Sequence, residues 1–187
     1  MMLEEYHDNG ITEEINWAYD MVLKKKVLGS QRALQFGGKP ALKKNARIYN
    51  CISSYCDRLD FFKECLWLML GGCGTGYSVQ KHHVAKLPKF YSKSVQEHVD
   101  KYIEPYIIPD TIEGWADALD KLIQSYFTDA PRVHFIFTEI RPEGTLLSSG
   151  IGKAPGPKGL ENALKAIDEL LLGCVQRGQN RIRPIDC

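Results

Sequence analysis

Apolar residues along the chain alternate between helical and strand spacing. Stretches with apolar residues three or four positions apart predict helices, and short runs rich in β-branched and aromatic residues predict strands. Helices are expected at residues 12–27, with Thr12 as N-cap, and at 31–35, 58–70, 93–104, 110–127 and 160–177. Strands are expected at residues 47–55, 77–80, 132–140 and 181–185. Because helices and strands follow one another along the chain, the pattern predicts an α/β fold.

Two glycine-rich segments interrupt this pattern. Residues 71–76, GGCGTG, connect a predicted helix to a predicted strand, whereas a dinucleotide fingerprint needs the order strand, glycines, helix. Such glycines either let backbone N–H groups approach an anion or make a tight connection. Residues 150–159, GIGKAPGPKG, are not a Walker A motif, because Ala154 follows Lys153. This loop is read either as a phosphate holder before a helix or as a solvated loop.

Composition and charge exclude several function classes. A formal net charge of +1 over 187 residues predicts no strong attraction to nucleic acid or to an anionic membrane. The longest apolar run, residues 65–70, is too short to cross a bilayer. The first ten residues are acidic and polar, unlike a signal peptide. We therefore expect a cytoplasmic protein, one domain or part of one, with reduced cysteines.

The six cysteines do not show the spacing of a metal site. Cys51 and Cys56 are separated by four residues, and no C-x-x-C pair is present, so no metal site is predicted. Adjacent His82 and His83 on a strand would point to opposite faces and would not share an ion. Cys65 lies in an apolar helix and is expected in the core, whereas the polar neighbours of Cys51 favour an accessible thiol.

A series of motifs is more specific than any one of them. From about residue 16 to residue 187 the chain carries, in this order, NARIYNC, DRLDFF, GGCGTGYSVQ, PDTIEGW, IRPEGTLLSSGIGKAPGP and RIRPIDC. This series resembles the catalytic chain of class II ribonucleotide reductases, and most of all the monomeric adenosylcobalamin-dependent ribonucleoside-triphosphate reductases. The resemblance implies a fragment, the first half, of the family's ten-stranded α/β barrel.

The resemblance also implies an activity and its residues. The family converts ribonucleoside tri- or diphosphates to 2'-deoxyribonucleotides by thiyl-radical chemistry, with adenosylcobalamin as cofactor and a thioredoxin-type reductant. Cys51 matches the first of the family's two redox cysteines. Asn50, Cys73 and Gly74 match positions that line the ribonucleotide substrate site, where backbone amides meet the substrate phosphates.

A deoxynucleotide effector is implied as a second ligand. Residues 147–157 resemble the family's first specificity loop, so that Ser149, Gly150 and Lys153 would contact the effector. Asp57 falls where the family often has an acid near the effector sugar. These four residues are therefore the predicted effector site.

The resemblance divides the chain into parts of a single partial catalytic domain. The parts are N-terminal helices at 1–46, the first barrel strands and glycine turn at 47–88, a helical insertion at 89–131, and a strand, specificity-type loop, helix and start of a strand at 132–187. The radical cysteine, the second redox cysteine and the cobalamin ligands match no residue of this sequence. We therefore expect the C-terminal half to come from a second polypeptide, as a separate chain or an intein-spliced product. The alternative is a catalytically inactive fragment that binds a nucleotide or a partner.

Overall fold

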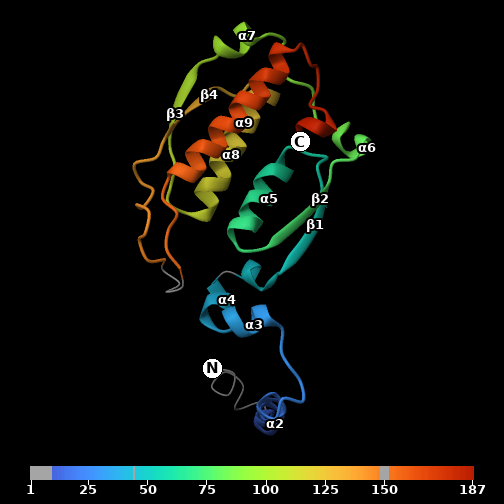
Figure 1. Cartoon of the computed structure of the whole chain (residues 1–187), viewed down its shortest axis with the longest axis vertical. Helices are drawn as coiled ribbons and strands as arrows, with labels where there is room; N and C mark the ends of the chain where they lie inside the picture. Colours follow the sequence, from blue (N-terminus) through green and yellow to red (C-terminus); the bar gives the residue numbers. More distant parts are fainter. Residues whose placement is uncertain (1–9, 44, 148–151) are drawn as a thin grey trace. The chain divides into compact units, whose positions relative to one another are not determined.

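The computed structural model describes residues 10–43, 45–147 and 152–187 (Figure 1). Clustering of contacts divides the chain into two compact units, Met1–Asn50 and Cys51–Cys187. Each unit is described by itself below.

The first unit consists of short helices. They are α2 (Thr12–Leu23), α3 (Gln31–Phe36), α4 (Lys39–Lys43) and the 3₁₀ helix η2 (Asn45–Ile48). The guanidinium groups of Arg32 and Arg47 both lie over the Phe36 ring, 5.5 and 5.8 Å from its centroid, which joins α3 to η2. The helix predicted at 31–35 is confirmed.

Two predictions for this region are wrong. Thr12 is not an N-cap but the first helical residue of α2, and Ile11 holds the cap position without a side-chain hydrogen bond. The strand predicted from residue 47 begins only at Cys51, since the preceding residues form η2.

The second unit is built from two strand–helix–strand motifs. The first consists of β1 (Cys51–Tyr55), α5 (Asp60–Leu70) and β2 (Gly74–Ser78), and the second of β3 (Ile103–Ile107), α8 (Ile112–Phe127) and β4 (Arg132–Ile136). Both strand pairs are parallel, as a helical crossover requires. Figure 1 shows α5 beside β1 and β2, and α8 and α9 (Lys158–Gln176) beside β3 and β4. Two short helices, α6 (Lys81–Val84) and α7 (Val95–Val99), lie in the sequence between these two strand–helix–strand motifs.

Three further predictions are corrected here. The helix expected at 93–104 is only α7, because the following residues Ile103–Ile107 pair with β4 as β3. The strand expected at 77–80 starts earlier, at Gly74, and His82 and His83 lie on α6 rather than on a strand. The strand expected at 181–185 is absent, and Pro184–Asp186 forms the 3₁₀ helix η3.

Helix α8 is the centre of the core, as its apolar stripe predicts. Its Thr111 cap accepts a hydrogen bond from the Gly114 N–H at 2.9 Å. A side chain at Gly114 would meet the Pro109 carbonyl at 2.6 Å, so only glycine fits against this turn. The helix packs against α5, α9 and β4. Its buried apolar side chains are those of Ala116, Ala118, Leu119, Leu122, Ile123, Tyr126 and Phe127.

A buried polar cluster joins α8 to α7 and α9. The Tyr126 hydroxyl donates to Asp168 Oδ1 on α9 at 2.6 Å. The ring of His98, from α7, stacks on the Tyr126 ring with the centroids 3.9 Å apart. Both side chains are about 1% exposed. Among the described residues, His98 Nδ1 has no hydrogen-bond partner.

Lys101 closes the C-terminal end of α8. Its ammonium donates to the carbonyl oxygens of Ser125 and Thr128, each at 2.8 Å, and of Ala130 at 3.3 Å. It also lies 4.6 Å from the centroid of the Tyr91 ring. A lysine therefore satisfies the carbonyls that the end of a helix leaves without an intrahelical donor.

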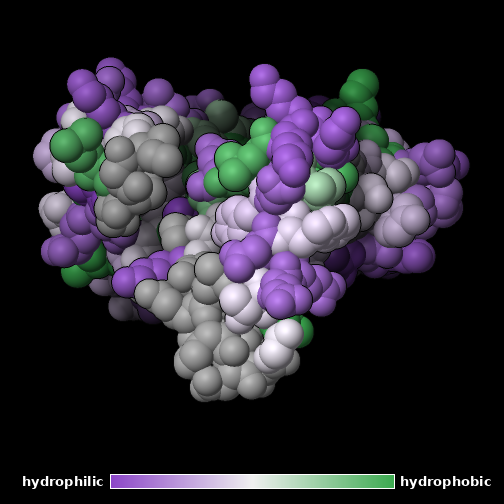
Figure 2. Space-filling model, turned by 90° about the horizontal axis from the view of Figure 1, so that it is seen from below, coloured by the Kyte–Doolittle hydropathy of each residue, from purple (hydrophilic) through white to green (hydrophobic). Residues whose placement is uncertain are grey.

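The surface is mixed in polarity. On the face that Figure 2 shows, hydrophobic residues (green) lie between hydrophilic ones (purple). Within residues 10–43, 45–147 and 152–187, no helix combines the length and the apolar character that crossing a bilayer demands.

The buried His98 makes stability depend on pH. Burial, aided by the charges of Arg132 and Lys101 and opposed by Asp168, lowers the pKa of His98 from 6.5 to about 4. Between these values the unfolded chain binds a proton that the folded chain does not, so the free energy of unfolding falls as the pH falls from 6.5 to 4. The loss is on the order of 3 kcal/mol.

Replacing this histidine tests whether its titration causes the pH dependence of the free energy of unfolding. His98→Phe keeps the stacked ring and removes the titrating group, so we expect its free energy of unfolding to fall less over the same pH range. Urea denaturation at pH 7, 5.5 and 4.5 measures the difference. His134→Gln, a change at an exposed histidine of β4, is the matched control and should follow the parent protein. Parallel pH profiles for the parent and His98→Phe would contradict the assignment.

Candidate functional site

The register of β1 and β2 decides which predicted site residues meet. Cys51 pairs with Gly74 and Tyr55 pairs with Ser78. Because the strands are parallel, their N-terminal ends lie at one edge of the sheet and their C-terminal ends at the other, roughly 13 Å away. Cys51, Cys73 and Gly74 belong to the first edge, and Asp57 belongs to the second.

Cys51 is the accessible thiol of the first edge. Cys51, Ser53 and Tyr55 alternate with half-buried residues and share the exposed face of β1. Cys73, one position before Gly74, is buried, and its thiol donates to the Gly74 carbonyl at 3.7 Å. The structure thus places Cys51, an exposed residue, beside the Gly74 backbone, and it buries Cys73.

The glycine turn ends helix α5 in a Schellman motif. The N–H of Gly72 donates to the Met69 carbonyl and the N–H of Cys73 to the Leu68 carbonyl, each at 2.9 Å. Gly72 has a φ of +90°, which glycine adopts without strain. The amides of residues 72 and 73 are therefore engaged within the protein. This favours the tight-connection interpretation for the first half of GGCGTG.

Asn50 is the last residue of the first compact unit. Its side-chain oxygen accepts a hydrogen bond from Arg32 Nε at 3.3 Å, and Asn50 is exposed. The predicted substrate-site role of Asn50 stays a prediction.

Asp57 lies just after β1, at the second edge of the sheet, between two cations. Its carboxylate accepts from Arg58 at 3.0 Å and from Lys86 at 3.5 Å. Desolvation works to raise the pKa of Asp57, but the hydrogen bonds and charges of Arg58 and Lys86 outweigh it and hold the pKa below 3.8. Asp57 is therefore ionised at neutral pH, and both of its carboxylate oxygens act only as hydrogen-bond acceptors.

A histidine pair completes this edge, and its contacts were not predicted from the sequence. His83 Nδ1 and Ser78 Oγ share a hydrogen bond of 3.0 Å. The His83 ring lies 4.5 Å from the Tyr55 ring and 3.9 Å from the His82 ring, so the prediction of opposite faces for the two histidines is wrong. Desolvation, with the charges of His82 and Lys86, lowers the pKa of His83. No local pattern indicates this cluster, because it depends on the register of β2.

Backbone hydrogen bonds join the two ends of the specificity-type loop. The Ala154 N–H donates to the Thr145 carbonyl at 2.7 Å, and Lys153 forms an antiparallel bridge with Leu146. Lys153 is exposed. Ser149 and Gly150 lie outside the described residues. The loop follows β4, whereas Asp57 follows β1, so these predicted effector residues come from different sheets.

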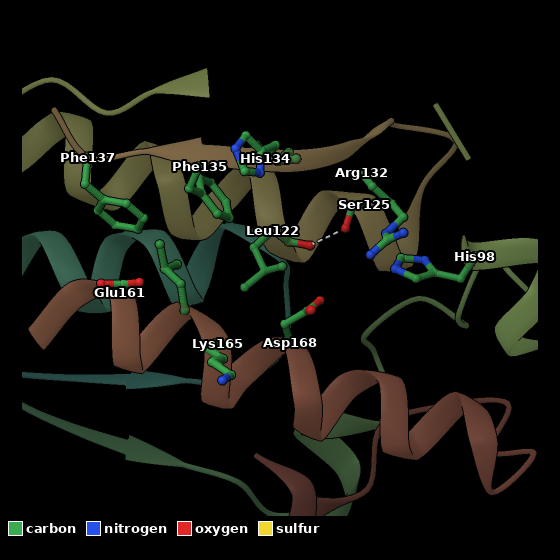
Figure 3. A pocket seen from close by; sticks show the side chains of 12 residues that line it. His98, Leu122, Ser125, Arg132, His134, Phe135, Phe137, Glu161, Lys165 and Asp168 are labelled. Atoms are coloured by element: carbon green, nitrogen blue, oxygen red, sulfur yellow. Dashed lines mark hydrogen bonds between the residues drawn. The ribbon is translucent and has the colours of Figure 1, made fainter. Parts of the chain in front are cut away.

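A separate cavity of about 260 Å³ lies between β4, α8 and α9 (Figure 3). Arg132, Phe135, Lys165 and Asp168 line it, and it includes none of the predicted site residues. Across the described ranges, no three His, Cys, Asp or Glu side chains gather closely enough to hold a metal ion.

Comparison with known proteins relates this arrangement to one enzyme class. No family model matches the chain. It is 37% identical over 68 residues to the adenosylcobalamin-dependent ribonucleoside-triphosphate reductase of Euglena gracilis, a match to 36% of this chain and 9% of that protein. It is 25% identical over 182 residues to a putative reductase of the same name from Mycobacterium phage D29, covering 82% of this chain and 26% of the relative. The enzyme from Lacticaseibacillus paracasei is 29% identical over 136 residues, 56% of this chain and 18% of that protein.

The three-dimensional comparison covers nearly the whole chain. The crystal structure of a B12-dependent (class II) ribonucleotide reductase superposes with a TM-score of 0.78 at 18% identity, over 95% of this chain and 31% of that one. The chain has part of the class II ribonucleotide reductase fold. The family resemblance and the predicted barrel fragment are thus confirmed. The chain spans about a quarter or less of the length of the reductases that it matches in sequence.

Within this reductase fold, thiol exposure predicts chemical reactivity. Cys51 is exposed, whereas Cys56, Cys65, Cys73 and Cys174 are buried. We expect iodoacetamide to alkylate Cys51 of the native chain well before these four, because the reagent reaches only an accessible sulfur. Timed quenching, digestion and fragment-ion mass spectrometry give the order, and urea-unfolded chain gives the reference rates. Equal native rates at Cys51 and Cys73 would contradict the proposed edge.

Proposed function

We propose that this chain forms part of the catalytic domain of an adenosylcobalamin-dependent ribonucleoside-triphosphate reductase, with Cys51 as a redox thiol. The observation that carries the proposal is the exposed Cys51 sulfur, held beside the Gly74 backbone at the start of two parallel strands, in a chain with the reductase fold. The similarity in sequence to three reductases of this name supports it.

The redox role follows from the balance of the reaction. Replacing a ribose 2'-hydroxyl by hydrogen consumes two electrons and two protons and releases water, and two thiols that become a disulfide supply both. Cys51 is one of these thiols. Cys56, Cys65, Cys73 and Cys174 are buried in the protein, and Cys187 follows η3 rather than lying on the strand that pairs with β1. We therefore assign the second thiol to the remainder of the barrel, supplied as a separate polypeptide or joined to this one.

The substrate lies along the first edge of the β1–β2 sheet in this proposal. Asn50 directly precedes β1, and Cys51 is the first residue of β1. Gly74, the first residue of β2, pairs with Cys51. Because the amides of residues 72 and 73 donate to α5, the approach of the substrate phosphates falls to the backbone from Gly74 onwards. Cys73 contributes to this edge through its backbone, since its side chain is buried and its thiol donates to the Gly74 carbonyl.

The effector lies at the second edge. The ionised Asp57 carboxylate accepts hydrogen bonds from the effector sugar, and Arg58 and Lys86 beside it offer cationic donors to phosphate. Ser149, Gly150 and Lys153 stay proposed effector contacts through the resemblance alone, because the described ends of their loop, between β4 and α9, lie at the other end of the second unit from α6 (Figure 1). The ligand at this edge is a deoxynucleotide.

The cofactor and the reductant come from the resemblance. Adenosylcobalamin, when bound, supplies the radical that starts the reaction, and a thioredoxin-type dithiol returns the cysteines to their reduced form. The cavity of Figure 3 suits a small ligand rather than a corrin macrocycle. We assign no residue of the described chain to the cofactor and derive no step through it.

Activity of the assembled barrel tests the proposal. The chain is combined with the remaining barrel of a reductase relative, fused or co-expressed, and assayed for nucleoside triphosphate reduction with adenosylcobalamin and thioredoxin. We expect multiple turnovers that Cys51→Ser abolishes, because the variant cannot form the disulfide. Glu169→Gln, on the exposed side of α9, is the matched control and should retain activity. An assembled complex in which Cys51→Ser turns over like the parent would refute the role of Cys51.

Effector binding gives an independent measure. We expect Asp57→Asn to weaken binding of dATP, dTTP or dGTP to the assembled complex by roughly ten- to a hundredfold, because a neutral amide replaces a charge-assisted acceptor. Equilibrium dialysis measures the dissociation constants. Asp117→Asn, which removes an acid that pairs with Lys63 between α5 and α8, is the matched control and should bind like the parent. Unchanged affinity in Asp57→Asn would remove Asp57 from the effector site.

A further inference from the structure

The cavity between β4, α8 and α9 has one polar end, formed by side chains from three elements. Arg132 comes from β4, His98 from α7 and Asp168 from α9. In Figure 3 these three side chains lie around the same end of the cavity, and the His98 imidazole points into it. A guanidinium, an imidazole and a carboxylate therefore face one another across a space that a small ligand can enter.

His98 brings a buried nitrogen to this end of the cavity. The residue is 1% exposed, and its Nδ1 atom has no hydrogen-bond partner among the described residues. Most buried polar atoms of side chains in folded proteins have such a partner. Because the imidazole lines the cavity, a polar group of a ligand there can supply one. Burial lowers the pKa of His98 to about 4, so the ring is neutral at pH 7.

The two charged groups at this end keep free hydrogen-bonding positions. The Arg132 guanidinium donates one long hydrogen bond, from Nη1 to the Val99 carbonyl at 3.4 Å, and forms no ion pair with a described residue. Asp168 Oδ1 accepts from the Tyr126 hydroxyl at 2.6 Å, whereas its Oδ2 accepts from no described side chain. A guanidinium has five N–H donors, and a carboxylate accepts at both oxygens. Both groups can therefore bind a ligand and keep their bonds within the protein.

The other end of the cavity is apolar. Leu122 and Phe135 line it, and Phe137 lies further from the polar end in Figure 3. Leu164, one helical turn before Asp168 on α9, is 4% exposed and adds an aliphatic wall. A ligand that reaches both ends must therefore have a charged or polar head and an apolar body.

We propose that this cavity binds a small zwitterion with an apolar side chain, that is, an apolar α-amino acid. Its carboxylate would meet the Arg132 guanidinium and its ammonium the Asp168 carboxylate. Its side chain would lie against Phe135 and Leu122. This inference goes beyond the proposed function and does not depend on it.

Charge and size both favour this class of ligand. A simple anion held by Arg132 would be repelled by Asp168, and a simple cation held by Asp168 would be repelled by Arg132. A zwitterion can place each of its charges at the opposite one. Lys165 and Glu161, which also line the cavity, carry opposite charges and leave this balance unchanged. Pockets for drug-sized molecules enclose roughly 300–1,000 Å³, and this cavity of about 260 Å³ is smaller.

Ligands that differ by one group test the proposal. Isothermal titration calorimetry of the chain at pH 7 compares L-phenylalanine with phenylpropionate, which lacks the ammonium, phenethylamine, which lacks the carboxylate, and L-alanine, which lacks the ring. We expect saturable binding of L-phenylalanine with a dissociation constant below about 1 mM, and binding of the other three that is weaker by about tenfold or more. Each of the three loses either a charge-assisted hydrogen bond or the apolar contact.

Two replacements test the protein side of the contact. Asp168→Asn removes the negative charge but keeps an oxygen that can accept from Tyr126, and Arg132→Gln removes the cation. Each should weaken binding of L-phenylalanine by roughly ten- to a hundredfold. Asp168→Asn should not weaken binding of phenylpropionate, because that ligand has no ammonium, whereas a purely structural defect would weaken both. Glu169→Gln, at an exposed position beside Asp168, is the matched control and should bind like the parent.

Three results would overturn the proposal. The first is no saturable binding of L-phenylalanine at millimolar concentration. The second is binding of phenylpropionate, phenethylamine or L-alanine as tight as that of L-phenylalanine. The third is a folded Asp168→Asn or Arg132→Gln chain that binds L-phenylalanine like the parent. Near-ultraviolet circular dichroism checks the fold of each variant, and the ligand series decides the question even if both variants fail to fold.

Discussion

The packing of α5 against α8 is the contact on which the second unit depends. Each sheet has only two strands, and two strands alone are marginally stable in water. Both crossover helices cover their own strands and then meet each other, so the two sheets share one core. Phe61 and Cys65 of α5 and Leu119 and Leu122 of α8 belong to this core. Lys63 adds an ion pair with Asp117 at 2.5 Å across the same contact.

A second layer of contacts fixes α9 and α7 on this pair of helices. Tyr126 is buried, yet its hydroxyl reaches Asp168, its ring meets His98, and its carbonyl accepts the Tyr91 N–H at 2.9 Å. One residue thereby connects four segments through its side chain and its carbonyl. Desolvation, with the Asp168 hydrogen bond and charge, raises the pKa of Tyr126, so the hydroxyl stays a donor over the working range of pH. Burial of His98 lowers the free energy of unfolding in acid, and the same burial places its ring against the Tyr126 ring at neutral pH.

The sequence predicts those parts of the fold that local signals encode. A cap at Asp110 or Thr111 and the stripe from Trp115 to Phe127 predict α8, because an N-cap and a 3.6-residue period are properties of a single segment, and the structure selects Thr111 as the cap. Cys51 is predicted in a strand because the residues around it are rich in β-branched and aromatic side chains, which is also a local property. The helix predicted at 93–104 fails because Val95, Val99, Tyr102 and Ile103 have helical spacing, whereas pairing with β4, a contact between distant segments, makes Ile103 part of a strand.

In the candidate site, too, the sequence indicates single residues but not the contacts between distant segments. The resemblance names Cys51, Gly74 and Asp57, but it does not indicate that Ser78 and His83 share a hydrogen bond or that Lys86 pairs with Asp57. Those contacts need the register of β1 on β2, which is set by helix packing and not by either strand alone.

The Schellman motif at the end of α5 has a consequence for the neighbourhood of Cys51. By fixing where β2 begins, it sets Gly74 opposite Cys51 and Gly76 opposite Ser53. Paired residues of adjacent strands point to the same face, and glycine places nothing there. A strip of bare backbone therefore runs beside the thiol on the exposed face of the sheet. A bulky reactant, or a sulfur from another part of the protein, can approach Cys51 along this strip without displacing a side chain.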